Sequence, residues 1–349
     1  MVRFDRFSAM NATFLSRSLE WPRTIRLVFL RENTIMTTIM LAHQTKNAVT
    51  KGYIICLTAT TFWSTTAIFI RYLTERFALP SIVLAFWRDT FVSLGLFVAL
   101  FLIRRSWLAL GRQHVSFFLL YGFLVSIFNL TWTLSVELNG AAVATVLAYS
   151  SPAFTAVLGW RLFKESLGRV KVAAVAMSFI GCFFVSGAYD ITQWRLNPLA
   201  LFVGLVSGLL FAFYSLMGKE AANRDLPPAT TLFYAFLPAS AYLLVYNLIP
   251  YIFQGLGAAP DLFYLKSSFE GWGVLLLLAL IPTIGGFGLY TASLAYLPAS
   301  VASLIATIEP VLTTLLAYLL LAERMSLAQL LGCALIGGGV VLLRVGESA

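Results

Sequence analysis

The chain has 349 residues, of which 60% are hydrophobic and 11% are charged, whereas soluble domains carry about 25% charged residues. This composition excludes a soluble globular protein and indicates an integral membrane protein. The apolar runs are roughly 20 residues long, which fits spanning helices and excludes a β-barrel, whose strands are roughly 10 residues long with alternating polarity. We attribute the net charge of +9 to membrane topology and contact with anionic lipid, rather than to nucleic-acid binding.

The residues that usually build enzyme and metal sites are scarce. The three cysteines, Cys56, Cys182 and Cys333, lie in apolar runs without CxxC spacing, and the two histidines, His43 and His114, lie at or near the polar ends of spans. The chain has no Walker A loop, no dinucleotide-binding glycine pattern and no GxSxG motif. We therefore expect no catalytic residue, no metal ion, no cofactor and no ATP-driven pumping by this chain alone.

Residues 1–51 differ from the rest of the chain. They are polar, carry six arginines and lack an apolar core long enough for a signal peptide. We predict a cytoplasmic, disordered tail. Two alternatives stay open: a transit peptide, against which the acidic residues of this segment count, and translation that begins at Met36 or Met40.

Ten apolar spans are predicted after this tail, and their short connections make neighbouring spans antiparallel. The spans are 52–70, 81–103, 115–136, 140–162, 170–188, 197–218, 229–249, 272–296, 298–321 and 326–344. With a cytoplasmic N-terminus, 12 Lys and Arg near span ends lie on the inner side and five on the outer side. Positive charge favours the cytoplasmic side, so both termini are predicted to be cytoplasmic.

One segment of the chain occurs twice. GAAVATVLAYSSPAFTAVLGWRLFKE (residues 140–165) aligns with PASVASLIATIEPVLTTLLAYLLLAE (residues 298–323) at an offset of 158, which matches Pro152 with Pro310. Each copy lies in a predicted span, so the chain carries a proline at the same depth in two halves. Duplicated membrane units of this kind suggest a transporter, because such folds place the substrate where two repeats meet.

A second alignment, at an offset of 148, sets Arg71 of span 1 against Lys219 of span 6. Spans 1 to 5 (residues 52–188) thus correspond to spans 6 to 10 (residues 197–344). Because five is odd, the second copy enters the membrane from the opposite face. This inverted duplication is the arrangement in which rocking of two halves gives alternating access.

These features carry a resemblance to a known family. Each repeat has a small-residue helix that leads to a Ser-Pro or Glu-Pro pair, at Ser151–Pro152 and Glu309–Pro310. Each segment closes on an acidic residue, Glu165 or Glu323, and the next helix carries Gly181 or Gly337–Gly339. The stretch PSIVLAFWR, Pro80–Arg88, is the fourth feature. The chain resembles the EamA-type members of the drug/metabolite transporter superfamily over residues 52–344. The resemblance implies an all-α fold of ten transmembrane helices, arranged as two inverted five-helix EamA repeats. It also implies a secondary transporter, commonly an exporter of small organic metabolites such as amino acids.

The two prolines predict a helix break in each repeat, because proline removes an intrahelical hydrogen bond and frees a carbonyl one turn earlier. Membrane helices tolerate proline, so Pro152 and Pro310 could be packing kinks. Their symmetric placement favours the interpretation that the freed carbonyls line a central cavity.

Glu309 is the most deeply placed carboxylate, and its counterpart in the first repeat is Ser151. This asymmetry favours a role for Glu309 in handling substrate or a coupling proton, with Ser151 at the same site. The alternative is a protonated acid bonded to a backbone carbonyl. Of the many aromatic residues, Tyr149, three residues before Pro152, and Trp63, in span 1 of the same repeat, are expected in the cavity. The others are expected at the membrane interface or in helix packing.

Arg88 and Asp89 fall within span 2, where a charge costs about 2.5–3.5 kcal/mol on insertion scales. Neighbours on a helix point about 100° apart, so the two cannot both face one narrow groove. Arg88 either forms a structural ion pair, with Asp89 or Glu309, or captures a substrate carboxylate or phosphate. Asp89 is expected to be structural. Glu165, like its repeat counterpart, is expected to cap or pair at a span end.

We predict a ten-helix secondary transporter of the bacterial plasma membrane that binds a small organic solute at the midplane. Arg88 would hold an anionic group and Glu309 a cationic group or a coupling proton. One alternative is a nucleotide-sugar or phosphate-ester antiporter, which needs several inward-facing cations. A non-transporting scaffold would need larger loops. An intramembrane enzyme would have Glu309 and Asp89 as its one acidic pair. Expected partners are the substrate, membrane lipids and protons as a candidate coupling ion, while substrate identity and oligomeric state stay open.

Overall fold

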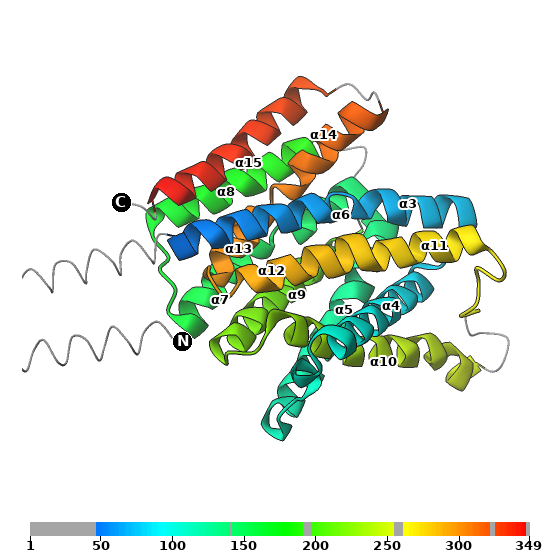
Figure 1. The fold of residues 1–349 in the computed structure, drawn as a ribbon. Helices are drawn as coiled ribbons and strands as arrows, with labels where there is room; N and C mark the ends of the chain where they lie inside the picture. Colours follow the sequence, from blue (N-terminus) through cyan, green and yellow to red (C-terminus); the bar gives the residue numbers. More distant parts are fainter. Residues whose placement is uncertain (1–46, 140, 191–196, 255–260, 322–324, 347–349) are drawn as a thin grey trace, which may run out of the picture. The chain divides into compact units, whose positions relative to one another are not determined.

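The computed structural model describes residues 47–139, 141–190, 197–254, 261–321 and 325–346. The chain divides between Thr50 and Lys51, and the architecture below is that of the unit Lys51–Ala349. All regular structure in its described residues is helical, as Figure 1 shows. Most of the predicted tail, residues 1–46, lies outside the described residues.

The first repeat occupies the N-terminal part of this unit. It consists of helical residues 51–63, α3 (Thr66–Phe77), α4 (Ser81–Ile103), α5 (Val115–Asn139), α6 (Ala141–Ala148), α7 (Ser151–Phe163) and α8 (Arg169–Val185). The connection between α4 and α5 contains two short 3₁₀ helices, η2 (Arg105–Leu108) and η3 (Arg112–His114).

The second repeat follows the same order of spans. It consists of α9 (Pro198–Asn223), α10 (Pro228–Gln254), α11 (Phe269–Leu278), the π-helix η5 (Ala279–Phe287), α12 (Gly288–Ser293), α13 (Ala299–Ala306), α14 (Glu309–Leu321) and α15 (Leu327–Gly346). Each of the ten predicted spans therefore coincides with one helix or with helices joined end to end.

Among the described residues, nine helical stretches are long and apolar enough to cross a membrane. The predicted span outside this set is the fifth, whose helix α8 has 17 residues. The predicted all-α fold of a multi-pass membrane protein is confirmed.

Spans 4 and 9 are broken near their middles by two-residue turns at Tyr149–Ser150 and Thr307–Ile308. Each turn immediately precedes a new helix in which Pro152 or Pro310 is the second residue. A proline there leaves no helical hydrogen bond unmade, because the first N–H groups of a helix have no intrahelical partner. The predicted breaks therefore exist, with each proline starting a helix rather than kinking one.

Span 1 has a break without a proline, at Ser64–Thr65. The Ser64 hydroxyl donates to the Thr61 carbonyl at 2.8 Å and the Thr65 hydroxyl to the Phe62 carbonyl at 2.7 Å. Such side-chain bonds compete with the backbone and bend membrane helices. Three spans are thus interrupted within the residues that the structure describes, and the interruption in span 1 was not predicted.

Helices α8 and α15 lie side by side along the unit (Figure 1). A Cβ atom built on Gly332 would lie 2.6 Å from the Gly181 carbonyl oxygen, so the two backbones are in direct contact. Small residues allow this close approach between membrane helices. On another part of the unit, the unbroken helix α5 packs against the unbroken helices α9 and α10. Helix α9 also contacts α6 and α7 of the broken span 4.

Candidate functional site

The two broken spans of opposite repeats are joined by one hydrogen bond at their breaks. The Tyr149 hydroxyl donates to Glu309 Oε2 at 2.5 Å, between residues 160 positions apart in the chain. Tyr149 follows the last residue of α6, and Glu309 is the first residue of α14. Both side chains are half-buried, whereas Ser151, the repeat counterpart of Glu309, is buried at the start of α7.

The surroundings of this bond are apolar. Tyr149 and Val311 pack against a buried cluster of Cys182, Val185 and Ile336, contributed by α8 and α15. Within the described part of the chain, no Lys or Arg forms an ion pair with Glu309. A carboxylate in such surroundings requires either a proton or a cationic ligand, because an unpaired buried charge is costly.

A second polar contact brings the break of span 1 to the same place. The Thr313 hydroxyl, one turn after Glu309 on α14, donates to the Ser64 carbonyl at 3.3 Å. Backbone groups at the break of span 1 therefore face the helix that carries Glu309. The structure brings together Tyr149, Glu309 and the interrupted backbone of spans 1, 4 and 9.

Trp63 lies in an aromatic cluster rather than at this hydrogen bond. Its side chain is 5% exposed, and its ring lies 4.9 Å from Phe287, 5.0 Å from Tyr290 and 5.9 Å from Phe211, measured between ring centroids. A Cβ atom on Gly286 would lie 2.4 Å from the indole, so the π-helix presents its glycine to this ring. The indole N–H has no hydrogen-bond partner among the described residues.

Arg88 has an internal partner. Its Nε donates to Asp89 Oδ1 at 3.2 Å, and the two side chains are 8% and 0% exposed. The other carboxylate oxygen, Asp89 Oδ2, accepts from the Asn129 amide at 2.7 Å. In the described structure no hydrogen bond or ion pair connects this group with Glu309.

The backbone carbonyls ahead of Pro152 face α9. A Cβ atom on Gly208 would lie 2.9 Å from the Leu147 oxygen and 3.0 Å from the Ala148 oxygen. In the first repeat, close packing against a glycine therefore covers the carbonyls that precede the break.

Glu165 caps a helix of the other repeat, as expected for a structural residue. Its carboxylate accepts the backbone N–H groups of Ala299 and Ser300 at the start of α13. Its counterpart Glu323 lies outside the described residues.

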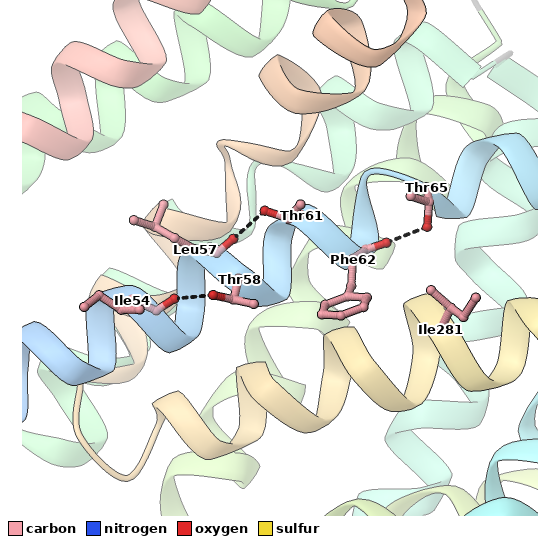
Figure 2. Close-up of a pocket in the computed structure, with 7 residues that line it drawn as sticks. All are labelled: Ile54, Leu57, Thr58, Thr61, Phe62, Thr65 and Ile281. Atoms are coloured by element: carbon pink, nitrogen blue, oxygen red, sulfur yellow. Dashed lines mark hydrogen bonds between the residues drawn. The ribbon is translucent and has the colours of Figure 1, made fainter. Parts of the chain in front are cut away.

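A groove lies between the first helix and the π-helix, with a volume of about 590 Å³. Figure 2 shows its lining, in which the hydroxyls of Thr58, Thr61 and Thr65 each donate to a carbonyl of their own helix. Its described lining contains no charged side chain. The hydroxyls of this lining have donated their protons and can only accept. The Tyr149–Glu309 region, which offers a carboxyl, is the better candidate site.

Several residues of these contacts were not singled out in the sequence. Asn129 could have been noticed as an amide in the middle of an apolar span, where an unpaired polar group is costly. Thr313 carries no comparable signal, because hydroxyls that bond their own helix are common in membrane spans. Lys171, one of the 12 Lys and Arg counted near span ends on the inner side, is buried against Ser300.

Comparison with family models identifies a family. The model of the EamA-like transporter family matches residues 50–187 and 198–345. The chain is 28% identical over 210 residues to the "Uncharacterized transporter YwfM" of Bacillus subtilis, covering 60% of this chain and 66% of that protein, just under two thirds of its length. It is 27% identical to the "Uncharacterized inner membrane transporter YicL" of Salmonella typhimurium, covering 84% of this chain and 95% of that protein.

A solved structure titled "Crystal structure of protein" has the same fold. It superimposes with a TM-score of 0.67 over 85% of this chain and 97% of its own, at 19% sequence identity.

Proposed function

Because the chain belongs to the EamA-like transporter family and is a multi-pass membrane transporter, we propose that it moves a small organic metabolite by secondary active transport with alternating access. The observation that supports this proposal is the hydrogen bond between Tyr149 and Glu309, which joins the breaks of two spans from opposite repeats. Inverted-repeat transporters bind substrate at such interrupted helices near the midplane. Substrate would enter between the two halves, and their relative motion would expose it to each side in turn.

The chemistry around Glu309 favours an amphipathic substrate with a positive group. The carboxyl has no cationic partner among the described side chains, while Tyr149 and Val311 belong to an apolar cluster. A substrate ammonium, or a coupling proton, would supply the missing positive charge. An amino acid or a similar zwitterion combines an ammonium with a part that the apolar residues could contact.

Arg88 is the candidate for the carboxylate of such a substrate, but it would first have to leave Asp89. A nucleotide-sugar or phosphate-ester antiporter is the alternative and needs several free cations facing the site. The described cations inside the helical bundle are engaged: Arg88 with Asp89, Lys171 with Ser300 and Lys219 with a backbone carbonyl. This observation favours the zwitterion.

We place the protein in the bacterial plasma membrane with both termini in the cytoplasm, and we propose export as the direction. The orientation rests on the excess of Lys and Arg on one side of the predicted spans. The direction rests on the resemblance of the repeats to exporters.

The proposal is tested by uptake into and efflux from proteoliposomes of a mixed pool of labelled amino acids and related metabolites, with and without an imposed pH gradient. The wild type is compared with Glu309→Gln, which keeps the shape of the side chain, and with Tyr149→Phe, which removes one hydroxyl. Glu220→Gln is the matched control, because Glu220 forms an exposed ion pair with Arg224.

Gradient-dependent accumulation in the wild type and the control, lost in Glu309→Gln, is the expected result. Tyr149→Phe should keep transport with a changed KM, because one hydrogen bond to the carboxyl is lost. Full gradient-driven transport by Glu309→Gln would remove the coupling role of Glu309. Absence of flux for every compound in a folded preparation would contradict the proposed class of substrate.

A further inference from the structure

Residues of other spans form hydrogen bonds with both sides of the corner between α12 and α13, namely the C-terminal end of α12 and the N-terminal end of α13. At its end, Glu165 Oε1 accepts the Ala299 N–H at 2.8 Å, and Oε2 accepts the Ser300 N–H at 3.3 Å and the Ser300 hydroxyl. Pro298, which precedes α13, has no side-chain hydrogen bond to the helix. The cap of this helix therefore comes from a residue 134 positions earlier in the chain, in the other repeat.

The end of α7 is shaped to deliver this carboxylate. Lys164 has a left-handed backbone, with φ of 55°, and turns the chain so that the Glu165 N–H donates to the Gly159 carbonyl at 3.2 Å. A Cβ atom on Gly159 would lie 2.9 Å from Glu165 Oε2. The absent side chain of Gly159 makes room for the carboxylate, so the turn places Glu165 against the other repeat.

Two lysines complete the arrangement. Lys171 on α8 is buried, donates to the Ser300 hydroxyl at 2.9 Å and lies 4.0 Å from Glu165 Oε2. Lys219 on α9 donates to the Leu294 carbonyl at 2.9 Å, at the C-terminal end of α12. An anion at a helix N-terminus and a cation at a helix C-terminus are the favourable placements for the helix dipole.

The matching pair of helices at the opposite end of the repeats is less deeply buried in its described residues. In the repeat alignment, the pair of α13 and α7 corresponds to the pair of α6 and α14. All eight residues of α13 are buried, and α13 packs against α7 and α9. In the matching helix α6, Thr145 and Ala148 are half-buried, and α14 packs against α8 and against the cluster that contains Ile336 of α15.

Side-chain burial shows the same difference. Thr155 on α7 is 0% exposed and donates to the Ser303 hydroxyl of α13 at 3.3 Å. Its repeat counterpart Thr313 on α14 is half-buried, as are its neighbours Val311 and Leu312. The described structure is therefore closed at the end that carries Glu165 and looser at the other end.

We infer that Glu165 is a positioning residue of the transport cycle: its cap on α13, supported by Lys171, holds closed the end of the bundle where α7 stops, and its release opens that end. The inference rests on the proposed alternating-access function. Under the proposed orientation this end is cytoplasmic. Once substrate has left on the opposite side, the Ala299 and Ser300 N–H groups would have to exchange Glu165 for water before the next substrate could enter.

The test measures access from each side by labelling with a membrane-impermeant maleimide in oriented membrane vesicles. The full chain, with its three native cysteines replaced by alanine, carries one reporter: Ser303→Cys in the closed α7–α13 contact or Thr313→Cys at the looser end. Each reporter is combined with Glu165→Ala, with Lys171→Met as a second way to weaken the cap, or with Glu220→Ala as the control.

Loss of the cap should raise the labelling rate of Ser303→Cys from the Glu165 side on the order of tenfold, the equilibrium change expected for one helix cap. Labelling of Thr313→Cys from the other side should fall, because the two ends open in alternation. Unchanged labelling of Ser303→Cys in both cap variants would overturn the inference. A rise at both reporters would also overturn it, since that result indicates general loosening.

These rates need no substrate, so they separate this inference from the proposed function. Altered access without flux in proteoliposomes would leave the closure in place and contradict the proposed transport. Normal flux with unchanged access would contradict the closure and leave transport standing.

Discussion

Replacing Asp89 by alanine is expected to lower the stability of the protein by about 3–5 kcal/mol, the usual cost of breaking a buried ion pair from one side. The change leaves the Arg88 guanidinium, 8% exposed, without its counter-ion. It also leaves the Asn129 amide without the carboxylate that accepts its hydrogen bond at 2.7 Å. At about 2 °C per kcal/mol for a chain of this size, Tm should fall by on the order of 6–10 °C.

The assay is thermal unfolding of the purified protein in detergent, followed by intrinsic tryptophan fluorescence. Removing both charges with Arg88→Met and Asp89→Leu should recover most of the loss, because no buried charge then remains unpaired. Glu220→Ala is the control. It breaks an exposed pair with Arg224, worth about 0.5 kcal/mol or less.

A Tm of Asp89→Ala within about 1 °C of the wild type would refute this account of Arg88, on the same scale of stability. A double variant less stable than Asp89→Ala would refute it as well. Either result would mean that Arg88 is not held by Asp89, and would favour its second role, the capture of a substrate anion.

Two further predictions concern close packing. Gly332→Ala should lower the free energy of unfolding by about 1–3 kcal/mol through overpacking, because its Cβ would lie 2.6 Å from the Gly181 carbonyl oxygen. Gly337→Ala should raise it by up to about 1 kcal/mol through helix propensity, because a Cβ there has nothing within 4 Å. Equal Tm values for these two variants would contradict the described contact of α8 and α15. Trp63→Phe should change stability by less than about 1 kcal/mol. The substitution removes a buried indole N–H that has no described partner, and the free energy gained by removing it offsets the ring packing that is lost. A loss of about 3 kcal/mol or more in the same melting assay would show that this N–H is bonded.

The sequence was most informative where local chemistry decides the structure. Apolar length predicted the helices, and the prolines located two of the three breaks because they recur at matching positions of the two repeats. A proline alone is a weaker signal, since α10 continues through Pro238 and Pro250. The break at Ser64–Thr65 was missed because serine and threonine occur throughout unbroken membrane helices. The π-helix around Pro282 was missed for a related reason, since a proline alone does not distinguish a wide turn from a kink.

The candidate site was harder to predict because its contacts join distant parts of the chain. Glu309 was singled out by its depth and Tyr149 by its distance from Pro152, but the bond between them spans 160 positions and follows from packing of the two repeats. The partner of Arg88 was one of two named alternatives. Choosing Asp89 required the position of Asn129, which fixes the other carboxylate oxygen.

The proposed mechanism needs symmetry in the helices and asymmetry in the side chains, and the two repeats provide both. Spans 4 and 9 break at matching positions, so each half can undergo the same motion. At the breaks, however, Tyr149 corresponds to Thr307 and Glu309 corresponds to Ser151. Thr307 and Ser151 are buried, and the Thr307 hydroxyl donates to a carbonyl of its own helix at 2.6 Å. One repeat therefore contributes a carboxyl where the other contributes a hydroxyl, which would give the positive group of a substrate one acidic contact between halves that move alike.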